Sequence, residues 1–298
     1  MKSGCQKQGR GDSTPHKLEG LSKILHQNLG IGSVKYRDWP YFHFDLTAGC
    51  GFNIVDDKSY AGSPLIFLQE ATSWHRHNVC ATFIDNNPEA CRMLMRTLVE
   101  YSDYQGPMGL VNYDCFTGGD LFDFVCTKHG QRCCMVEIPL PDNSVAWIKC
   151  DDNRNVLKNS MLAMKPKNSN YFGSMTIDPN GAKMPLKEMR DFLREWARID
   201  LILVVSATQI KRNRGAFPRT VSLRLADFEA YFGKRYNWIH APDDGDHWQR
   251  VIIVSRNFMP QSMPNGFLPW SEARDLLEWL DKSERERHDK QSRLFNLS

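Results

Sequence analysis

A glycine turn with a carboxylate just before it follows the first apolar run of the sequence. The segment FHFDLTAGCG begins at Phe42, and its candidate ligand-binding residues are Asp45, Thr47, Gly49 and Gly51. Glycine carries no Cβ, so a Gly-x-Gly turn lets the backbone come close to a bound ligand. Doubly wound sheets hold adenosine-type cofactors at the end of their first strand. The segment therefore predicts a cofactor pocket at this turn.

The next two apolar runs also end in acidic residues. Asp85 and Asn86 follow the run ATFI, and a carboxylate at that point can accept hydrogen bonds from both hydroxyls of a ribose. Asp114 and Cys115 follow a third run, where the carboxylate would meet an adenine amino group. Each acidic residue also has a plainer interpretation, because aspartate is a common helix N-cap. Their repetition at three successive strand ends favours a cofactor site.

A nicotinamide dinucleotide is the obvious competing ligand, and the sequence after the turn argues against it. Dinucleotide sites show GxGxxG running straight into a helix whose N-terminus holds the phosphates. Here Gly51 is followed by Phe52, Asn53, Ile54 and an irregular DDKSYAG stretch. S-adenosylmethionine contains no phosphate and tolerates such a turn. We therefore predict S-adenosylmethionine as the cofactor.

Alternating strand and helix patterns would position these residues. Such alternation predicts a mostly parallel sheet covered by helices on both faces. After an amphipathic helix that starts at His16, the expected strands are 41–47, 79–84 and 108–113, and the expected helices are 63–74, 88–100 and 120–128.

The segment 131–170 breaks this alternation, and we predict that it is an inserted hairpin and loop. Its two strand patterns, 134–140 and 145–150, flank a turn at Pro141. Strands 171–177 and 201–206 and helix 186–197 then restore the rhythm, and a last helix is expected at 271–288. Strands 236–240 and 250–255 are too close in sequence for a crossover helix, so they should form an antiparallel hairpin.

The length of 298 residues suits one large α/β domain with insertions, or two small domains. We expect a single domain over 16–298, preceded by a polar, disordered arm over 1–15. No run of 18 apolar residues and no secretory leader pattern occurs. These features predict a cytoplasmic protein without a membrane segment.

The net charge and the cysteines bear on two kinds of site, a nucleic-acid-binding surface and a metal site. A net charge of +3 is too small to indicate a nucleic-acid partner without a local basic cluster. The nine cysteines are an odd number, lie mostly in apolar runs and include no CxxC pair. We therefore expect reduced thiols and no metal site.

Four motifs together resemble the three-Cys-motif partner protein family, whose members are similar to class I methyltransferases. They are DLTAGCG, GSPL from Gly62, FIDNNP from Phe83 and TIDPNG from Thr176. The resemblance spans roughly residues 41–206. It implies a Rossmann-like α/β fold with a seven-stranded, mostly parallel sheet and an antiparallel last strand. It names a cofactor, S-adenosylmethionine, more firmly than a substrate.

The last of these motifs stands where amino-directed methyltransferases carry an Asp-Pro-Pro-Tyr type sequence. Its candidate catalytic residues are Asp178, Pro179 and Asn180. An Asp or Asn side chain in such a motif accepts a hydrogen bond from the target amine and aims its lone pair at the methyl group. Gly181 replaces the aromatic residue that would stack on a flipped base. The alternative is that DPNG is simply a turn after a strand.

A basic loop follows the strand 201–206, at the same edge of the sheet as the predicted pocket. Its cations suit phosphate contacts, which makes a DNA or RNA partner a hypothesis beside that of an ordinary charged surface. The candidate nucleic-acid-binding residues are Lys211, Arg212, Arg214 and Arg219.

The combined prediction is an S-adenosylmethionine-dependent methyltransferase acting on an amino group of a nucleic-acid base. No Pro-Cys motif supplies a thiolate for carbon methylation of cytosine. The alternative is a catalytically silent cofactor- or nucleotide-binding partner protein, as in a phage or defence system, because a fold does not determine activity. Binding to a protein partner is a further hypothesis.

Overall fold

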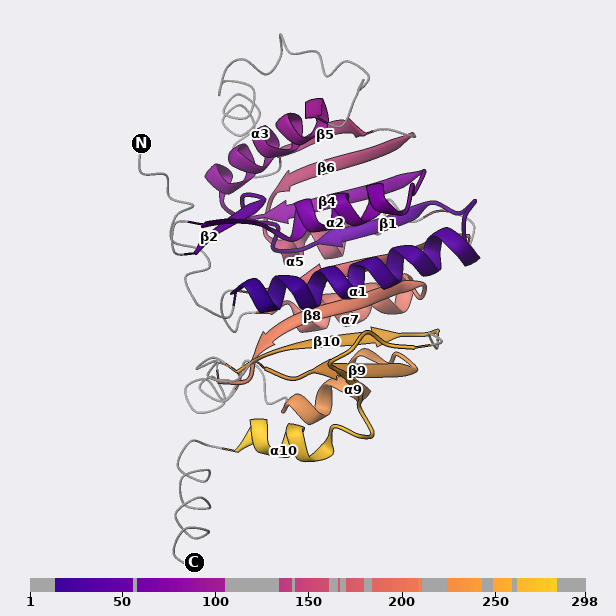
Figure 1. Cartoon of the computed structure of the whole chain (residues 1–298), viewed down its shortest axis with the longest axis vertical. Helices are drawn as coiled ribbons and strands as arrows, with labels where there is room; N and C mark the ends of the chain where they lie inside the picture. The colour runs from indigo at the N-terminus through magenta and orange to yellow at the C-terminus, as the bar shows by residue number, and fades with distance from the viewer. Residues whose placement is uncertain are drawn as a thin grey trace, which may run out of the picture.

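A nine-stranded sheet with helices on both faces forms the centre of the molecule (Figure 1). The computed structural model describes residues 14–55, 58–104, 134–140, 143–160, 166, 170–179, 184–208, 210, 224–242, 249–258 and 262–282. Within them the strands are β1 (Tyr41–Asp45), β2 (Phe52–Val55), β3 (Lys58–Ala61), β4 (Val79–Asp85), β5 (Cys134–Leu140), β6 (Ser144–Cys150), β7 (Phe172–Ile177), β8 (Ile199–Ser206), β9 (Tyr236–His240), β10 (Arg250–Arg256) and β11 (Phe267–Pro269). The helices are α1 (Thr14–Lys35), α2 (Ser63–Ser73), α3 (Pro88–Tyr104), α5 (Asn153–Asn155), the π-helical turn Val156–Ser160, α7 (Leu186–Glu195), the 3-10 turn Leu225–Asp227, α9 (Phe228–Phe232) and α10 (Arg274–Asp281).

The sheet has the order β11-β9-β10-β8-β7-β1-β4-β6-β5. Its five central strands, β8, β7, β1, β4 and β6, are parallel to their neighbours in this group. Strand β10 lies antiparallel between β8 and β9, and β5 and β11 are antiparallel edge strands. The carboxyl ends of the five parallel strands therefore meet at one edge, which is where open α/β sheets bind ligands.

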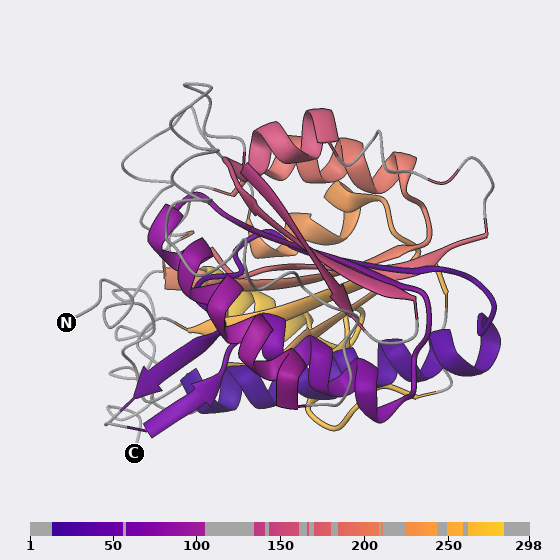
Figure 2. The same cartoon turned by 90° about the horizontal axis from the view of Figure 1, so that it is seen from above.

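Two hydrophobic layers hold the helices against the sheet. Helices α1, α2 and α3 cover one face, and α7 and α9 cover the other, as the view from above shows (Figure 2). Leu277 and Leu280 of α10 pack in the same hydrophobic layer as α7 and α9. Strand β8, with the sequence IDLILVVS, is almost continuously apolar because helices cover both of its faces. Helix α7 buries Leu186, Met189, Phe192 and Leu193, which recur at helical spacing on one side.

Most expected elements are confirmed, with boundaries shifted by a few residues. The strands predicted at 79–84, 171–177, 201–206 and 236–240 are β4, β7, β8 and β9, and the antiparallel hairpin of β9 with β10 is present. Helix α1 begins at Thr14, so Thr14 and Pro15 belong to a helix rather than to the predicted arm. Residues 1–13 lie outside the described part of the chain. Helix α10 begins at Arg274, three residues later than predicted.

The hairpin predicted within 131–170 is confirmed, but it belongs to the main sheet instead of being inserted beside it. Strands β5 and β6 do form an antiparallel hairpin, but β6 also pairs in parallel with β4, with Asp85 opposite Cys150. Ala146 and Ile148 of β6 are fully buried, so this strand completes the hydrophobic layer beneath α3 instead of leaving the sheet. The segment 108–113, predicted to be a strand, lies outside the described residues, within which the neighbours of β4 are β1 and β6.

Two smaller corrections concern strand number and the DDKSYAG stretch. Within the described residues the sheet has nine strands rather than seven, because β5 and β11 extend its edges. Within the stretch predicted to be irregular, Lys58–Ala61 is strand β3, which pairs antiparallel with the preceding β2 from Phe52 opposite Ala61 to Val55 opposite Lys58. Asp56 and Asp57 lie outside the described residues. The expected reversal of a late strand is confirmed by β10.

Two further properties of the described residues are the state of their cysteines and the character of their helices. Cys50, Cys80, Cys91 and Cys150 form no disulfide bond with one another. None of the helices described is long and apolar enough to cross a membrane.

Candidate functional site

The glycine turn after β1 is fixed to both neighbouring strands. The N–H of Leu46 donates to the carbonyl of Thr176 at 2.9 Å, and the N–H of Ala48 donates to the carbonyl of Ile84 at 2.9 Å. Gly49 then has φ of 61° and Gly51 has φ of 88°, a left-handed backbone that residues with a Cβ rarely adopt. The turn predicted from the sequence is therefore present and rigidly placed at the carboxyl edge.

A second glycine lets the chain pass closely behind this turn. The N–H of Gly62, just before α2, donates to the carbonyl of Gly51 at 2.7 Å. A Cβ on Gly62 would stand 2.9 Å from the carbonyl carbon of Gly51, closer than real Cβ atoms come to other atoms. The GSPL motif is thus explained by backbone packing against the turn, with Pro64 in the first turn of the helix.

The side chain of Asp85 holds the glycine turn in place through hydrogen bonds to backbone amides. Its Oδ2 accepts a hydrogen bond from the N–H of Gly49 at 3.0 Å, and its Oδ1 accepts one from the N–H of Asn87 at 2.8 Å. Burial raises the pKa of the Asp85 carboxyl, and the backbone amides of Asn87, Gly49 and Asn86 oppose that rise. Each carboxylate oxygen has a second lone pair, so the side chain can still accept a hydrogen bond from a ligand.

Asp45 is a fully buried carboxyl at the end of β1. Its Oδ1 accepts a hydrogen bond from the N–H of Thr47 at 3.1 Å, whereas its Oδ2 accepts none from the described residues. Burial, together with the negative charges of Asp178 and Asp85, raises the pKa of Asp45 to about 7, and hydrogen bonding by the Ser63 hydroxyl and the Thr47 amide opposes that rise. An orphaned carboxyl oxygen beside the turn is a group that a ligand donor or cation would satisfy.

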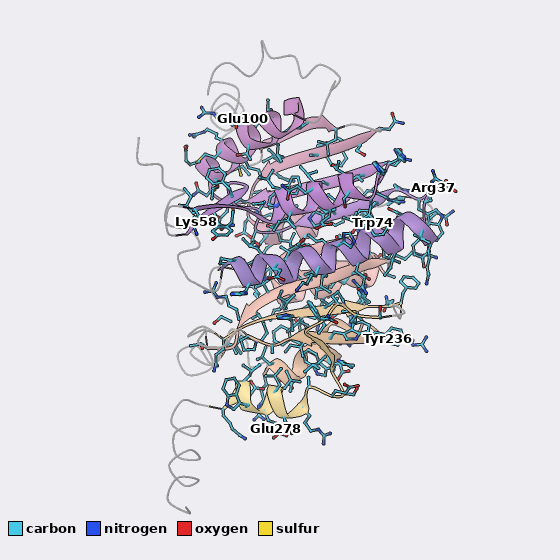
Figure 3. The ribbon with its side chains drawn as sticks, viewed as in Figure 1. Arg37, Lys58, Trp74, Glu100, Tyr236 and Glu278 are labelled. Atoms are coloured by element: carbon cyan, nitrogen blue, oxygen red, sulfur yellow. The ribbon has the colours of Figure 1, made fainter. Side chains whose placement is uncertain are left out.

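A cleft opens in front of the turn, between the start of α1 and the ends of β1, β7 and β8. Asp178 stands on one wall, where its N–H donates to the Thr47 hydroxyl at 2.7 Å. On the opposite wall Lys17 places its Nζ 2.5 Å from Oδ2 of Asp178. Figure 3 shows the β2–β3 hairpin, marked by Lys58, at this edge of the sheet, and Arg37 after the far end of α1 at the other. The cleft is lined by Lys17, Leu18, Leu21, Thr47, Ala48, Gly49, Cys50, Gly51, Phe52, Asn53, Gly62, Ser63, Asp178 and Val204.

The structure brings together part of the predicted site. Residues that line the cleft are Thr47, Gly49, Gly51 and Asp178. Asp45 and Asp85 lie at the turn without lining the cleft, Asn86 is exposed, and Pro179 follows Asp178 half-buried. The predicted residues that fall outside the described part of the chain are Asp114, Cys115, Asn180, Lys211, Arg212, Arg214 and Arg219.

Two residues near the turn were missed by sequence reasoning. Asp151 directly follows β6, and its N–H donates to the carbonyl of Asp85 at 3.1 Å. A carboxylate after an apolar strand was the same signal that identified Asp85, but the strand had been assigned to an insertion. Lys17 carried no sequence signal, because a lysine in the first turn of an amphipathic helix is ordinarily solvated.

Comparison with known proteins yields distant structural likenesses. No family model matches the chain, and no curated protein matches its sequence, so the likeness to the three-Cys-motif partner family rests on the quoted motifs alone. A DUF519 family protein from Legionella pneumophila superposes with a TM-score of 0.49 at 13% identity, covering 88% of this chain and 91% of that protein. SMU.472, a proposed methyltransferase in complex with S-adenosylhomocysteine (SAH), gives 0.37 at 12% identity over 86% of this chain and 57% of that one. The plantazolicin methyltransferase BpumL, also in complex with SAH, gives 0.34 at 9% identity over 83% and 91%.

These likenesses are too distant to assign a function. All three TM-scores lie below 0.5, and all three identities lie below 25%. The cleft's own residues must therefore carry any functional proposal.

Proposed function

We propose that the chain binds S-adenosylmethionine in the cleft in front of the glycine turn and transfers its methyl group to an acceptor amine. The observation that carries the proposal is the turn itself: left-handed Gly49 and Gly51, bracketed by Asp85, with the Asp178 carboxylate across the cleft. A backbone wall without a Cβ suits close approach by an adenosyl ligand.

The residues present fit this cofactor on their own chemistry. Asp178 lines the cleft with a carboxylate. At the turn beside the cleft, the buried Oδ2 of Asp45 accepts no hydrogen bond within the described residues, and Asp85 retains lone pairs. The cofactor carries hydroxyl and ammonium donors and a positive sulfonium, which match an acidic surround. When bound, it supplies an electrophilic methyl group.

Asp178 is the residue proposed to orient the acceptor. Its carboxylate is 26% exposed at the cleft, and its backbone is fixed by the hydrogen bond to Thr47. Such a carboxylate accepts a hydrogen bond from an amine and directs the nitrogen lone pair into the cleft, which is catalysis by positioning. We further propose a nucleic-acid base as the acceptor, on the strength of the basic segment 211–219 and the DPNG sequence.

Calorimetric titration with SAH tests the cofactor assignment. We expect binding by the wild type and roughly ten- to hundredfold weaker binding by Asp85→Ala, because the Gly49 amide loses its acceptor and the turn loosens. Asp191→Ala, which removes an exposed carboxylate on α7, is the matched control and should bind as the wild type does. Absence of binding by the wild type would refute the proposal.

Transfer of a labelled methyl group tests the second half of the proposal. DNA, RNA and protein are offered separately as acceptors, with Asp178→Asn alongside. Transfer to nucleic acid that depends on Asp178 supports an amino-directed methyltransferase. SAH binding without transfer to any acceptor would instead favour a cofactor-binding partner protein.

A further inference from the structure

The ion pair across the cleft points to a role for Lys17 that rests on the proposed cofactor. Nζ of Lys17 lies 2.5 Å from Oδ2 of Asp178, and the two side chains are 12% and 26% exposed. Among the described residues that line the cleft, Lys17 is the single basic side chain. A cation and an anion in contact at a ligand cleft present complementary partners to a ligand that carries both charges.

S-adenosylmethionine carries such a pair of charges on its aminoacyl end, a carboxylate and an ammonium. Asp178, the acidic residue that lines the described part of the cleft, can accept hydrogen bonds from ammonium and hydroxyl groups when ionised, but it cannot donate one to a carboxylate. The carboxylate requires a donor, and lysine offers three N–H donors on a flexible stem.

We propose that Lys17 exchanges partners: it holds Asp178 in the free protein and binds the cofactor's carboxylate in the complex. The exchange releases Oδ2 of Asp178 at the moment the cofactor arrives. Asp178 is then free to accept a hydrogen bond from the acceptor amine, so the acceptor site becomes available only when the cofactor is in place. Lys17 is in this scheme a cofactor-binding residue that also controls Asp178.

The position of α1 explains how one lysine can serve both partners. The helix starts at the carboxyl edge of the sheet and crosses its face towards the other edge (Figure 1). Leu18, Leu21, Leu25 and Leu29 are buried along it, which fixes the helix axis while the Lys17 side chain stays in the cleft. Only the lysine side chain has to move for the exchange.

The test compares two ligands that differ only in the aminoacyl end. SAH carries it, whereas 5′-methylthioadenosine has the same adenosine and thioether without it. Lys17→Met should bind SAH about tenfold more weakly than the wild type and bind methylthioadenosine equally well. Lys17→Arg should restore part of the SAH affinity, and thermal unfolding in the absence of ligand verifies that both variants are folded.

The exchange itself is tested in an Asp178→Asn background. In that variant Lys17 has no ion pair with residue 178 to break, so SAH should bind at least as tightly as it does to the wild type. Lys17→Met should then lower the SAH affinity by a larger factor than it does in the wild type. Equal losses for both ligands, or no loss for SAH, would overturn the role of Lys17 and leave the proposed function standing. Failure of the wild type to bind either ligand would overturn both.

Discussion

Replacing Gly62 with alanine tests whether the glycine turn builds the cleft. Gly62 has φ of −80° and ψ of 176°, which alanine adopts without strain, so the substitution adds only a methyl group. That methyl would stand 2.9 Å from both the carbonyl carbon and the oxygen of Gly51 and 3.2 Å from the nitrogen of Phe52. All three are backbone atoms of the turn, so the strain has no flexible side chain to absorb it.

The expected cost follows from this geometry. Extra methyl groups in tightly packed regions destabilise by about 1–3 kcal/mol, and here the same movement displaces the wall of the cleft. We expect a loss of that size in the free energy of unfolding, measured with urea, and at least tenfold weaker SAH binding measured by calorimetry.

Gly233→Ala is the matched control for Gly62→Ala. Gly233 ends α9 with φ of 63° and has open space where a Cβ would lie. Alanine there pays about 1 kcal/mol in backbone conformation alone. It should lower stability without changing SAH affinity. If Gly62→Ala kept both wild-type stability and wild-type affinity, the reasoning from the Gly51 contact would be refuted.

Two further predictions concern buried charges. Burial raises the pKa of Asp45 in the folded protein to about 7, from an ordinary value of 3.8. Ionisation of Asp45 therefore lowers the free energy of unfolding. This destabilisation is absent below about pH 4, grows as the pH rises and is complete above about pH 7. Asp45→Asn should therefore raise the free energy of unfolding at pH 8 by up to roughly 4 kcal/mol and change it little at pH 4, which urea unfolding at the two pH values measures. Arg256→Met should cost about 3–5 kcal/mol because it leaves Asp200, its partner at 2.9 Å, buried without that cation; a loss below 1 kcal/mol in urea unfolding would contradict this view of the pair.

The sequence sufficed for elements whose patterns are local. Strand β8 and helix α7 have apolar residues at unmistakable spacing, and the short link between β9 and β10 dictated their antiparallel pairing. The glycine turn was equally readable, because glycines directly after an apolar strand have few structural reasons other than a close approach.

The predictions that were wrong or missing concern contacts between residues far apart in the sequence. Strand β6 looks like half of a local hairpin with β5. Nothing in its residues reveals that its other edge pairs with β4, in which Cys80 lies 65 positions before its partner Val145. Asp151 was lost with it. The pairing of Lys17 with Asp178 spans 161 positions and depends on where α1 crosses the sheet, which periodicity does not determine.

Two buried aspartates show why the cleft, rather than the core, is the place to look for function. Asp200 is buried beside Arg256, accepts a hydrogen bond from Asn28 at 2.6 Å, and is favoured in its charged form by Lys234 as well. Burial raises its pKa to about 6 even so. Its charge is balanced inside the fold, as a structural role requires.

Asp45 is buried as completely as Asp200, but the charged groups around it are different. Within the described residues it has no ion pair, and its charged neighbours are the carboxylates Asp178 and Asp85. A buried acid surrounded by acids destabilises the free protein, and a core position would be served better by asparagine or an apolar residue. This destabilisation arises at the end of β1, beside the glycine turn, where a bound hydrogen-bond donor or cation would remove it.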